Sequence, residues 1–221
     1  MQTVSRFANA TNETRVCLIR HGETDWNAQR RVQGQIDIPL NARGRFQAEA
    51  VACGLADECF TALYSSDLQR ALQTAEPTAA LHHLAIRSDP LLRERHYGVL
   101  QSLTAEEARV RHPRASLRHA ARDPDYDYED GESLSAFDQR ISECLRALFR
   151  RHPGETVLVV THGGVLDVAY RHAKGRPLTS RRDFALPNAG FNWLEGDAER
   201  WRVVTWADVS HIGLALDELP P

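Results

Sequence analysis

The chain of 221 residues lacks the features that mark several large classes of protein. It has no apolar run long enough to span a bilayer and no signal-peptide hydrophobic segment near Met1. Its formal net charge is -3, whereas general nucleic-acid binders are usually basic over the whole domain. We therefore expect a cytoplasmic protein that binds neither nucleic acid nor a membrane.

Cysteine is scarce, and its spacing suggests neither a disulfide framework nor a metal site. The four cysteines include no Cys-x-x-Cys pair, so we expect them to be reduced and mostly packed: Cys17, Cys53, Cys59 and Cys144. The His-Glu-x-x-His pattern of zinc hydrolases is absent, and so is the Gly-x-Ser-x-Gly elbow of serine hydrolases. We expect no metal and no cofactor.

Short apolar stretches alternate along the chain with amphipathic ones. This alternation predicts an α/β fold, a three-layer α/β/α sandwich with a mostly parallel central sheet. We expect a flexible N-terminal tail over 1–14 and a single domain over 15–221. The expected strands are 16–19, 62–64, 86–89, 156–160, 191–194 and 201–206. Helices are expected at 41–57, from about 66 to 81, at 104–112, after Pro113, from 135 onward and at 165–172.

Several local features follow from the same patterns. We expect Phe46, Ala50 and Cys53 on the inner face of the first helix, and a surface loop over 24–39. A capping box from Ser135 to Asp138 would open the long helix. The inner face of that helix would carry four apolar side chains, Phe137, Ile141, Leu145 and Leu148.

Two of the predicted buried strands end in the same way. Val16 to Ile19 is followed by Arg20-His21-Gly22, and Thr156 to Val160 is followed by Thr161-His162-Gly163-Gly164. Open α/β sheets place their ligand sites at the carboxyl ends of parallel strands. Two strands that each deliver a histidine and a glycine indicate one site that both strands share.

The polar residues expected at these ends suit chemistry on a phosphoryl group. Arg20 and Arg70 supply planar guanidinium groups for bidentate phosphate contact, and glycines beside His162 let backbone N–H groups approach the anion. Adjacent fixed cations lower the pKa of an imidazole, so a neutral imidazole in this pocket could attack phosphorus. Glu94 could protonate the leaving alcohol and later deprotonate water.

Four motifs together resemble those of the histidine phosphatase superfamily, which has the phosphoglycerate-mutase-like fold. They are Arg20-His21-Gly22-Glu23-Thr24, Ser66-Asp67-Leu68-Gln69-Arg70-Ala71 with Thr74-Ala75, Glu94-Arg95-His96-Tyr97-Gly98 and Thr161-His162-Gly163-Gly164. The resemblance implies that His21 is the phosphorylated nucleophile and that Glu94 is the proton donor. It implies that Arg20, Arg70 and His162 bind the phosphoryl group. It also implies substrate contacts at five positions: Asn27, Gln33, Gly34, Tyr97 and Gly163.

Departures from the mutase pattern favour the phosphatase branch. Cofactor-dependent mutases carry a lysine about where this chain has Ala105, an asparagine where it has Gly164, and a longer arginine-bearing insertion. We therefore expect a phosphomonoester hydrolase acting on a small phosphorylated metabolite. A 2,3-bisphosphoglycerate-dependent phosphoglycerate mutase is the alternative, because Glu-Arg-His-Tyr-Gly is mutase-like. A catalytically silent binding module is the alternative from another class.

Two further features, a set of arginines and an acidic segment, each have two interpretations. Arg114, Arg118 and Arg122 would share one helix face, which is either a solvated surface or a site for a second anion. The acidic stretch 123–132 is either part of a lid formed by residues 104–132 or a mobile surface loop. A homodimer is possible on this sequence, and the substrate itself is not identified by it.

Overall fold

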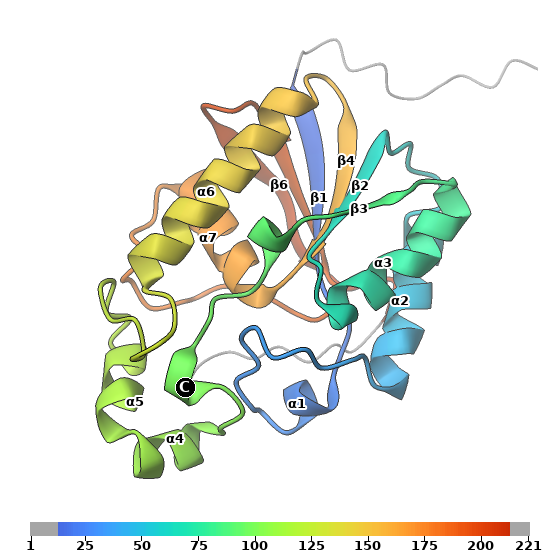
Figure 1. Ribbon diagram of the computed structural model, residues 1–221. Helices are drawn as coiled ribbons and strands as arrows, with labels where there is room; N and C mark the ends of the chain where they lie inside the picture. The colour runs from blue at the N-terminus through green and yellow to red at the C-terminus, as the bar shows by residue number, and fades with distance from the viewer. Residues whose placement is uncertain (1–12, 213–221) are drawn as a thin grey trace, which may run out of the picture.

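The computed structural model describes residues 13–212, which form one six-stranded sheet with helices on both faces (Figure 1). The strands are β1 (Thr14–Arg20), β2 (Ala62–Ser65), β3 (Ile86–Ser88), β4 (Thr156–Thr161), β5 (Phe191–Gly196) and β6 (Trp201–Asp208). Their order is β3-β2-β4-β1-β5-β6. The first four in that order are mutually parallel, whereas β5 is antiparallel to β1 and β6. The predicted mostly parallel sheet is confirmed.

The central strands β1 and β4 have apolar interiors, over 16–19 and 157–160, because both of their faces are covered. Cys17 and Ile19 face the layer of α2 (Ala42–Gly54) and α3 (Gln69–His82). Val16 and Leu18 face the opposite layer, formed by α6 (Leu134–Arg151) and α7 (Gly163–Lys174). Figure 1 shows α2 and α3 on one side of the sheet and α6 and α7 on the other. The three-layer sandwich is therefore confirmed.

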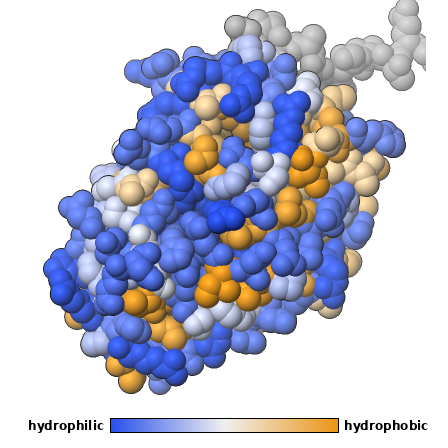
Figure 2. Space-filling model, in the orientation of Figure 1, coloured by the Kyte–Doolittle hydropathy of each residue, from blue (hydrophilic) through white to orange (hydrophobic). Residues whose placement is uncertain are grey.

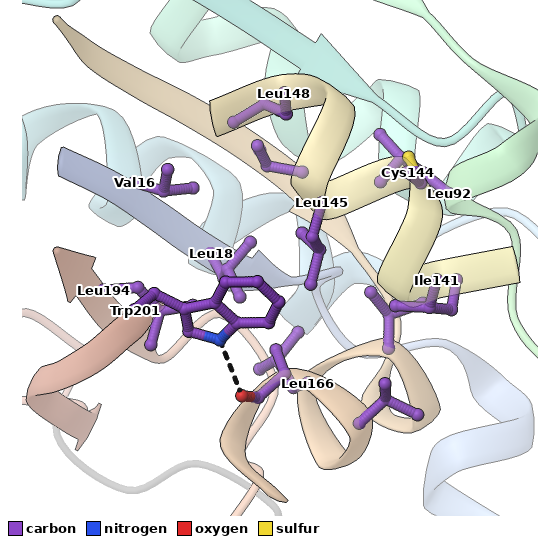
Figure 3. Close-up of a cluster of buried hydrophobic side chains, with 14 of the residues drawn as sticks. Val16, Leu18, Leu92, Ile141, Cys144, Leu145, Leu148, Leu166, Leu194 and Trp201 are labelled. Carbon is purple, nitrogen blue, oxygen red and sulfur yellow. Dashed lines mark hydrogen bonds between the residues drawn. The ribbon is translucent and has the colours of Figure 1, made fainter. Parts of the chain in front are cut away.

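The larger core lies between the sheet and α6, as Figure 3 shows. Phe137, Ile141, Leu145 and Leu148 all point inward from α6, as predicted. Trp201 closes the cluster, and its indole N–H donates to the Ala169 carbonyl at 3.1 Å. This hydrogen bond satisfies the indole's polar atom in an otherwise apolar surrounding.

Shorter elements gather at the end of the molecule where β1 finishes (Figure 1). They are α1 (Asp25–Ala28), the 3₁₀ turns η1 (Pro90–Leu92) and η2 (Gly98–Leu100), α4 (Ala105–Arg111) and α5 (Pro113–Ala120). A small core of their own holds α4, α5 and η2 together, with Leu100, Ala108 and Tyr128 at its centre. Figure 2 shows a largely polar face with apolar side chains in separate groups; Val110 and Leu117 of this helix pair are exposed.

Some local predictions were wrong. Phe46 is 65% exposed and Cys53 is exposed, because α2 instead buries Gln47, Ala48 and Val51. Cys59 is exposed too, so only two of the four cysteines are packed. The surface loop expected after Thr24 contains the helix α1.

Three boundaries also differ from the prediction. The cap of α6 is Ser133, whose hydroxyl accepts from Ala136 N, and not Ser135. Arg122 lies beyond the end of α5, so the three arginines do not share one helix face. Thr14 is the first residue of β1, although the tail was expected to reach it; residues 1–12 and 213–221 lie outside the described part. Between residues 13 and 212, no helix is long and apolar enough to cross a membrane.

Candidate active site

Two buried histidines lie side by side where β1 and β4 end. The parallel register pairs Arg20 with Thr161, so His21 and His162 leave neighbouring strands at the same level. Their ring centroids are 5.2 Å apart, with the planes tilted by 59°. His21 is 3% exposed and His162 is fully buried. The predicted convergence of the two His-Gly strand ends is therefore present in the fold.

The hydrogen bonding of His21 fixes its tautomer. Its Nδ1 lies 2.7 Å from the Gly22 carbonyl oxygen, which can only accept, so Nδ1 carries the proton. The lone pair of the ring is then on Nε2. Burial, followed by the charges of Arg70 and Arg20, holds the pKa of His21 well below its ordinary value. His21 is therefore a neutral imidazole whose Nε2 can act as a nucleophile.

His162 is oriented from the opposite side of its ring. Its Nε2 lies 2.8 Å from the Ser66 hydroxyl, and its buried Nδ1 has no hydrogen-bond partner within residues 13–212. Burial and the charge of Arg70 keep the pKa of His162 well below its ordinary value. His162 also caps the N-terminus of α7, where backbone N–H groups favour an anion.

Two buried arginines are held by backbone carbonyls. Arg20 donates from Nη1 to the Leu186 carbonyl at 2.7 Å. Arg70, on the first turn of α3, donates to the carbonyls of Ile36 at 2.8 Å and Gly34 at 2.7 Å. Burial lowers the pKa of Arg70 to about 10, which still leaves it charged at neutral pH. Both side chains are fixed cations beside the imidazoles.

Gly34 supports Arg70 through its backbone. Its φ of 55° lies in the left-handed region, and a Cβ there would come within 2.1 Å of the Gln101 amide oxygen. Only glycine fits this turn without a rearrangement. Gly34 thus supports Arg70 through its carbonyl oxygen, and the substrate contact that the resemblance implied for Gly34 stays a prediction.

Glu94 bridges its own loop and the start of α7. One carboxyl oxygen accepts from Arg95 N at 2.8 Å, and the other accepts from Gly164 N at 2.9 Å. Burial raises the pKa of Glu94, although these backbone hydrogen bonds and the two arginines oppose the rise. A Cβ on Gly164 would lie 2.1 Å from the Glu94 Oε1 atom. The carboxyl occupies the space that a side chain at 164 would need.

The remaining predicted residues lie around this centre in different settings. Asn27 is buried in a capping box with Thr24 at the start of α1. Gln33 is 9% exposed, with a buried amide oxygen that has no partner among the described residues. Tyr97 packs edge-on against His119 and Tyr128, and burial raises the pKa of its hydroxyl.

Gly163 begins α7, and a Cβ there would be 3.5 Å from the Arg20 Nε atom. The structure therefore brings together His21, His162, Arg20, Arg70, Glu94 and Gly163. Asn27 and Gly34 make the backbone and capping contacts described above, and their substrate contacts stay predictions.

Three supporting residues were not predicted. The Ser66 hydroxyl contacts the His162 ring at 2.8 Å. Thr74 accepts from Gly22 N at 2.9 Å and donates to the Arg70 carbonyl. Asn188 donates to the His21 carbonyl at 2.8 Å. Ser66 and Thr74 stood inside a quoted motif, but nothing in the sequence around Asn188 pointed to a site.

The donors in this site suit an anion better than a metal cation. Two arginines, two imidazoles and the N-terminus of α7 surround one carboxyl group. In the described range 13–212, no group of three or more His, Cys, Asp or Glu side chains could hold a metal ion. Arginine does not coordinate cations, because it carries donors only. The arrangement can bind a phosphoryl group and transfer a proton to an oxygen beside it.

Comparison with known proteins gives a consistent result. The histidine phosphatase superfamily (branch 1) matches residues 16–209. Phosphoglycerate mutase-like protein 4 of Arabidopsis thaliana is 38% identical over 94% of this chain and 91% of its own length. The metal-independent phosphoserine phosphatase of Arabidopsis thaliana is 38% identical over 90% of this chain and 83% of its own. A mycobacterial glucosyl-3-phosphoglycerate phosphatase structure covers 89% of this chain and 99% of its own, with 31% identity and a TM-score of 0.76. The chain belongs to the histidine phosphatase superfamily, branch 1.

Proposed function

We propose that this protein is a phosphomonoester hydrolase that acts on small phosphorylated metabolites through a phosphohistidine on His21. The observation that carries the proposal is the convergence of a neutral, tautomer-fixed imidazole with two buried arginines and a protonatable carboxyl. Relatives named for phosphoserine and glucosyl-3-phosphoglycerate support a small phosphorylated substrate.

The first half of the reaction forms the phosphohistidine. The His21 Nε2 lone pair attacks phosphorus while Arg20, Arg70 and His162 hold the phosphoryl oxygens. The bond from phosphorus to the leaving oxygen breaks as the nitrogen–phosphorus bond forms. The leaving oxygen takes the proton of Glu94, so the alcohol departs neutral and Glu94 becomes a carboxylate.

The second half returns the enzyme to its starting state. Water attacks the phosphohistidine and gives its proton to the Glu94 carboxylate. The nitrogen–phosphorus bond breaks, inorganic phosphate is released, and both the imidazole and the carboxylic acid are regenerated. The buried position of Glu94, which raises its pKa, favours this exchange between protonated and ionised forms.

Hydrolysis is favoured over mutase activity by the contact between Glu94 and α7. The carboxyl accepts from Gly164 N and leaves no room for the asparagine that mutases carry there. We expect phosphate release from several monoesters. We expect 3- to 2-phosphoglycerate interconversion at least tenfold slower, a barrier difference of about 1.4 kcal/mol.

The test combines trapping with a side-by-side assay. Substrate is mixed with enzyme, quenched in base, and the phosphorylated residue is located by mass spectrometry. We expect an acid-labile, base-stable phosphate on His21, and no turnover by a folded His21→Ala variant. Phosphate on another residue would refute the intermediate. Fast, 2,3-bisphosphoglycerate-stimulated interconversion with little free phosphate would favour the mutase.

The proposed reaction uses cations of the chain itself. We therefore expect turnover to persist after dialysis against EDTA, measured as phosphate release with and without added magnesium or zinc. Activity that is lost on chelation and restored by either metal would contradict this part of the proposal.

A further inference from the structure

The segment that carries Glu94 forms no regular secondary structure. Residues 93–97 run between η1 and η2 outside any helix or strand. Backbone carbonyls in such a segment need partners from elsewhere when they are shielded from water. The position of the Glu94 carboxyl therefore depends on whatever holds this backbone.

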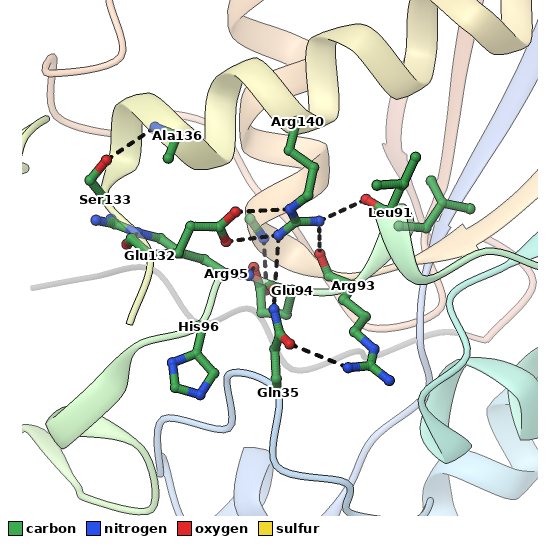
Figure 4. Close-up of polar contacts among 12 residues, drawn as sticks. Gln35, Leu91, Arg93, Glu94, Arg95, His96, Glu132, Ser133, Ala136 and Arg140 are labelled. Atoms are coloured by element: carbon green, nitrogen blue, oxygen red, sulfur yellow. Dashed lines mark hydrogen bonds and ion pairs between the residues drawn. The ribbon is translucent and has the colours of Figure 1, made fainter. Parts of the chain in front are cut away.

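Arg140 of α6 provides two of those partners and also reaches the end of η1, as Figure 4 shows. Its Nη1 donates to the carbonyls of Leu91 at 2.7 Å and Arg93 at 3.0 Å, and its Nη2 donates to the Glu94 carbonyl at 3.4 Å. Nε and Nη2 each donate to the Glu132 carboxylate at 2.8 Å. A guanidinium has five N–H bonds, and Arg140 uses all five.

Glu132 holds the same segment from its own side. Its backbone N–H donates to the His96 carbonyl at 2.8 Å, and its carbonyl accepts from Arg95 Nε at 2.7 Å. Its carboxylate pairs bidentately with Arg140, a geometry that orients both side chains. Arg140 and Glu132 therefore fix the backbone on both sides of residue 94.

Gln35 reaches the Glu94 carbonyl as well (Figure 4). Its amide nitrogen donates to that oxygen at 3.1 Å. Glu94 is thus held at two points. Its backbone carbonyl accepts from Arg140 and Gln35, and its carboxyl accepts from Arg95 N and Gly164 N. Displacing the carbonyl end would move the carboxyl away from the leaving oxygen.

We infer that Arg140 and Glu132 are positioning residues for the proton donor, holding the Glu94 backbone so that its carboxyl meets the leaving oxygen. The inference rests on the proposed function, because it assumes that Glu94 is the acid. Neither side chain needs to touch substrate. Catalytic groups lose efficiency when their support is displaced by as little as about 0.5 Å.

The experiment compares two substrates that depend on the acid to different degrees. Alkyl phosphates such as phosphoserine need a proton on the leaving oxygen, whereas p-nitrophenyl phosphate releases a stable phenolate without one. We expect Arg140→Gln to lower kcat/KM for phosphoserine about tenfold to a hundredfold, a partial loss of the ~10²–10⁴ that general acid catalysis contributes. The loss for p-nitrophenyl phosphate should be less than about threefold. The ratio of the two kcat/KM values does not depend on how much of the preparation is folded.

Further variants separate positioning from packing. Glu132→Gln should change the ratio in the same direction, and the double variant should lose little beyond Arg140→Gln alone, because the two act as one unit. Arg140→Lys keeps the charge and stem but offers only three donors, so it should fail to restore the ratio. Arg150→Gln, on an exposed position of the same helix, should leave the ratio unchanged.

Glu94→Gln provides the reference. If Glu94→Gln lowers kcat/KM by the same factor for phosphoserine and for p-nitrophenyl phosphate, the acid role in the proposed function is wrong. Suppose instead that Glu94→Gln loses more kcat/KM with phosphoserine than with p-nitrophenyl phosphate, as an acid should. The positioning role is then overturned, and the proposed function stands, if Arg140→Gln lowers kcat/KM equally for both substrates or if Arg140→Lys restores the ratio.

Discussion

Gly164 determines how closely the Glu94 carboxyl approaches the first turn of α7. We predict that Gly164→Ala lowers kcat/KM for an alkyl phosphate by at least about tenfold, since general acid catalysis contributes ~10²–10⁴ and the new Cβ would lie where Glu94 Oε1 now is. Steady-state kinetics with phosphoserine and a thermal unfolding curve of the same preparation provide the measurement.

Gly163→Ala is the matched comparison one residue earlier. Its Cβ would make ordinary contact with Arg20 at 3.5 Å, so its loss should be clearly smaller. Equal losses for the two variants would show that the effect comes from the helix N-terminus in general and not from the contact with Glu94.

The pKa values at the site also predict the pH dependence of kcat/KM. Burial raises the pKa of Glu94 and depresses that of His21, which widens the pH range in which a protonated Glu94 and a neutral His21 coexist in the free enzyme. With an alkyl phosphate, kcat/KM should fall as pH rises through the raised pKa of Glu94. In Glu94→Gln this decline should disappear. A decline of the same shape in that variant would assign it to another group.

At the scale of single elements, the cap of α6 affects stability. Ser133 accepts from Ala136 N at 3.1 Å, whereas Ser135 makes only a 3.4 Å contact with Asp125 on the surface. Ser133→Ala should reduce the free energy of unfolding by about 1 kcal/mol, and Ser135→Ala by much less. Urea denaturation of the two variants measures the difference. A larger loss of unfolding free energy for Ser135→Ala would show that Ser135 is the cap, as the sequence predicted.

The elements that could be predicted from the sequence are those whose burial is apolar. β1 and β4 have unbroken apolar runs, and α6 has a clear inner stripe. The face of α2 could not be predicted, because its buried side carries Gly44 and Gln47. Gly44 approaches the Glu23 backbone, and the Gln47 amide accepts from Glu23 N at 2.7 Å. Periodicity finds apolar burial and overlooks polar burial of this kind.

The same limit applies to the site. His21, Arg70, Glu94 and His162 stand in motifs with definite spacing, and the fold brings them together as predicted. Asn188 reaches His21 only through the tertiary fold, across 167 residues of chain. α1 has four residues, too few for a periodic pattern, so it too was missed.

For the whole molecule, the two buried imidazoles predict how stability responds to acid. In the folded chain the pKa of His21 and the pKa of His162 both lie well below 6.5. Below about pH 6.5 these two side chains therefore bind protons in the unfolded chain but not in the folded one. The free energy of unfolding should therefore fall as the pH drops from 7.5 to 5.5. Each histidine contributes a slope of up to about 1.4 kcal/mol per pH unit.

His162→Gln isolates one of these contributions. Its free energy of unfolding, from urea curves at several pH values, should show a slope lower by up to about 1.4 kcal/mol per pH unit than that of the unaltered protein. The exposed His83 serves as the control, and His83→Asn should keep the full slope. An unchanged slope in His162→Gln would mean that His162 takes up its proton without unfolding.

The strand order has a consequence for synthesis of the protein on the ribosome. β1 is synthesised well before its two neighbours in the sheet, β4 and β5, which begin at Thr156 and Phe191. At translation rates of roughly 5–20 residues per second, the apolar run 16–19 waits on the order of ten seconds or more for a partner. During that time it is an unpaired, aggregation-prone strand. Nascent chains that end before β4 should therefore depend most on chaperones, and β1, which leads into His21, is the segment such chaperones would need to shield.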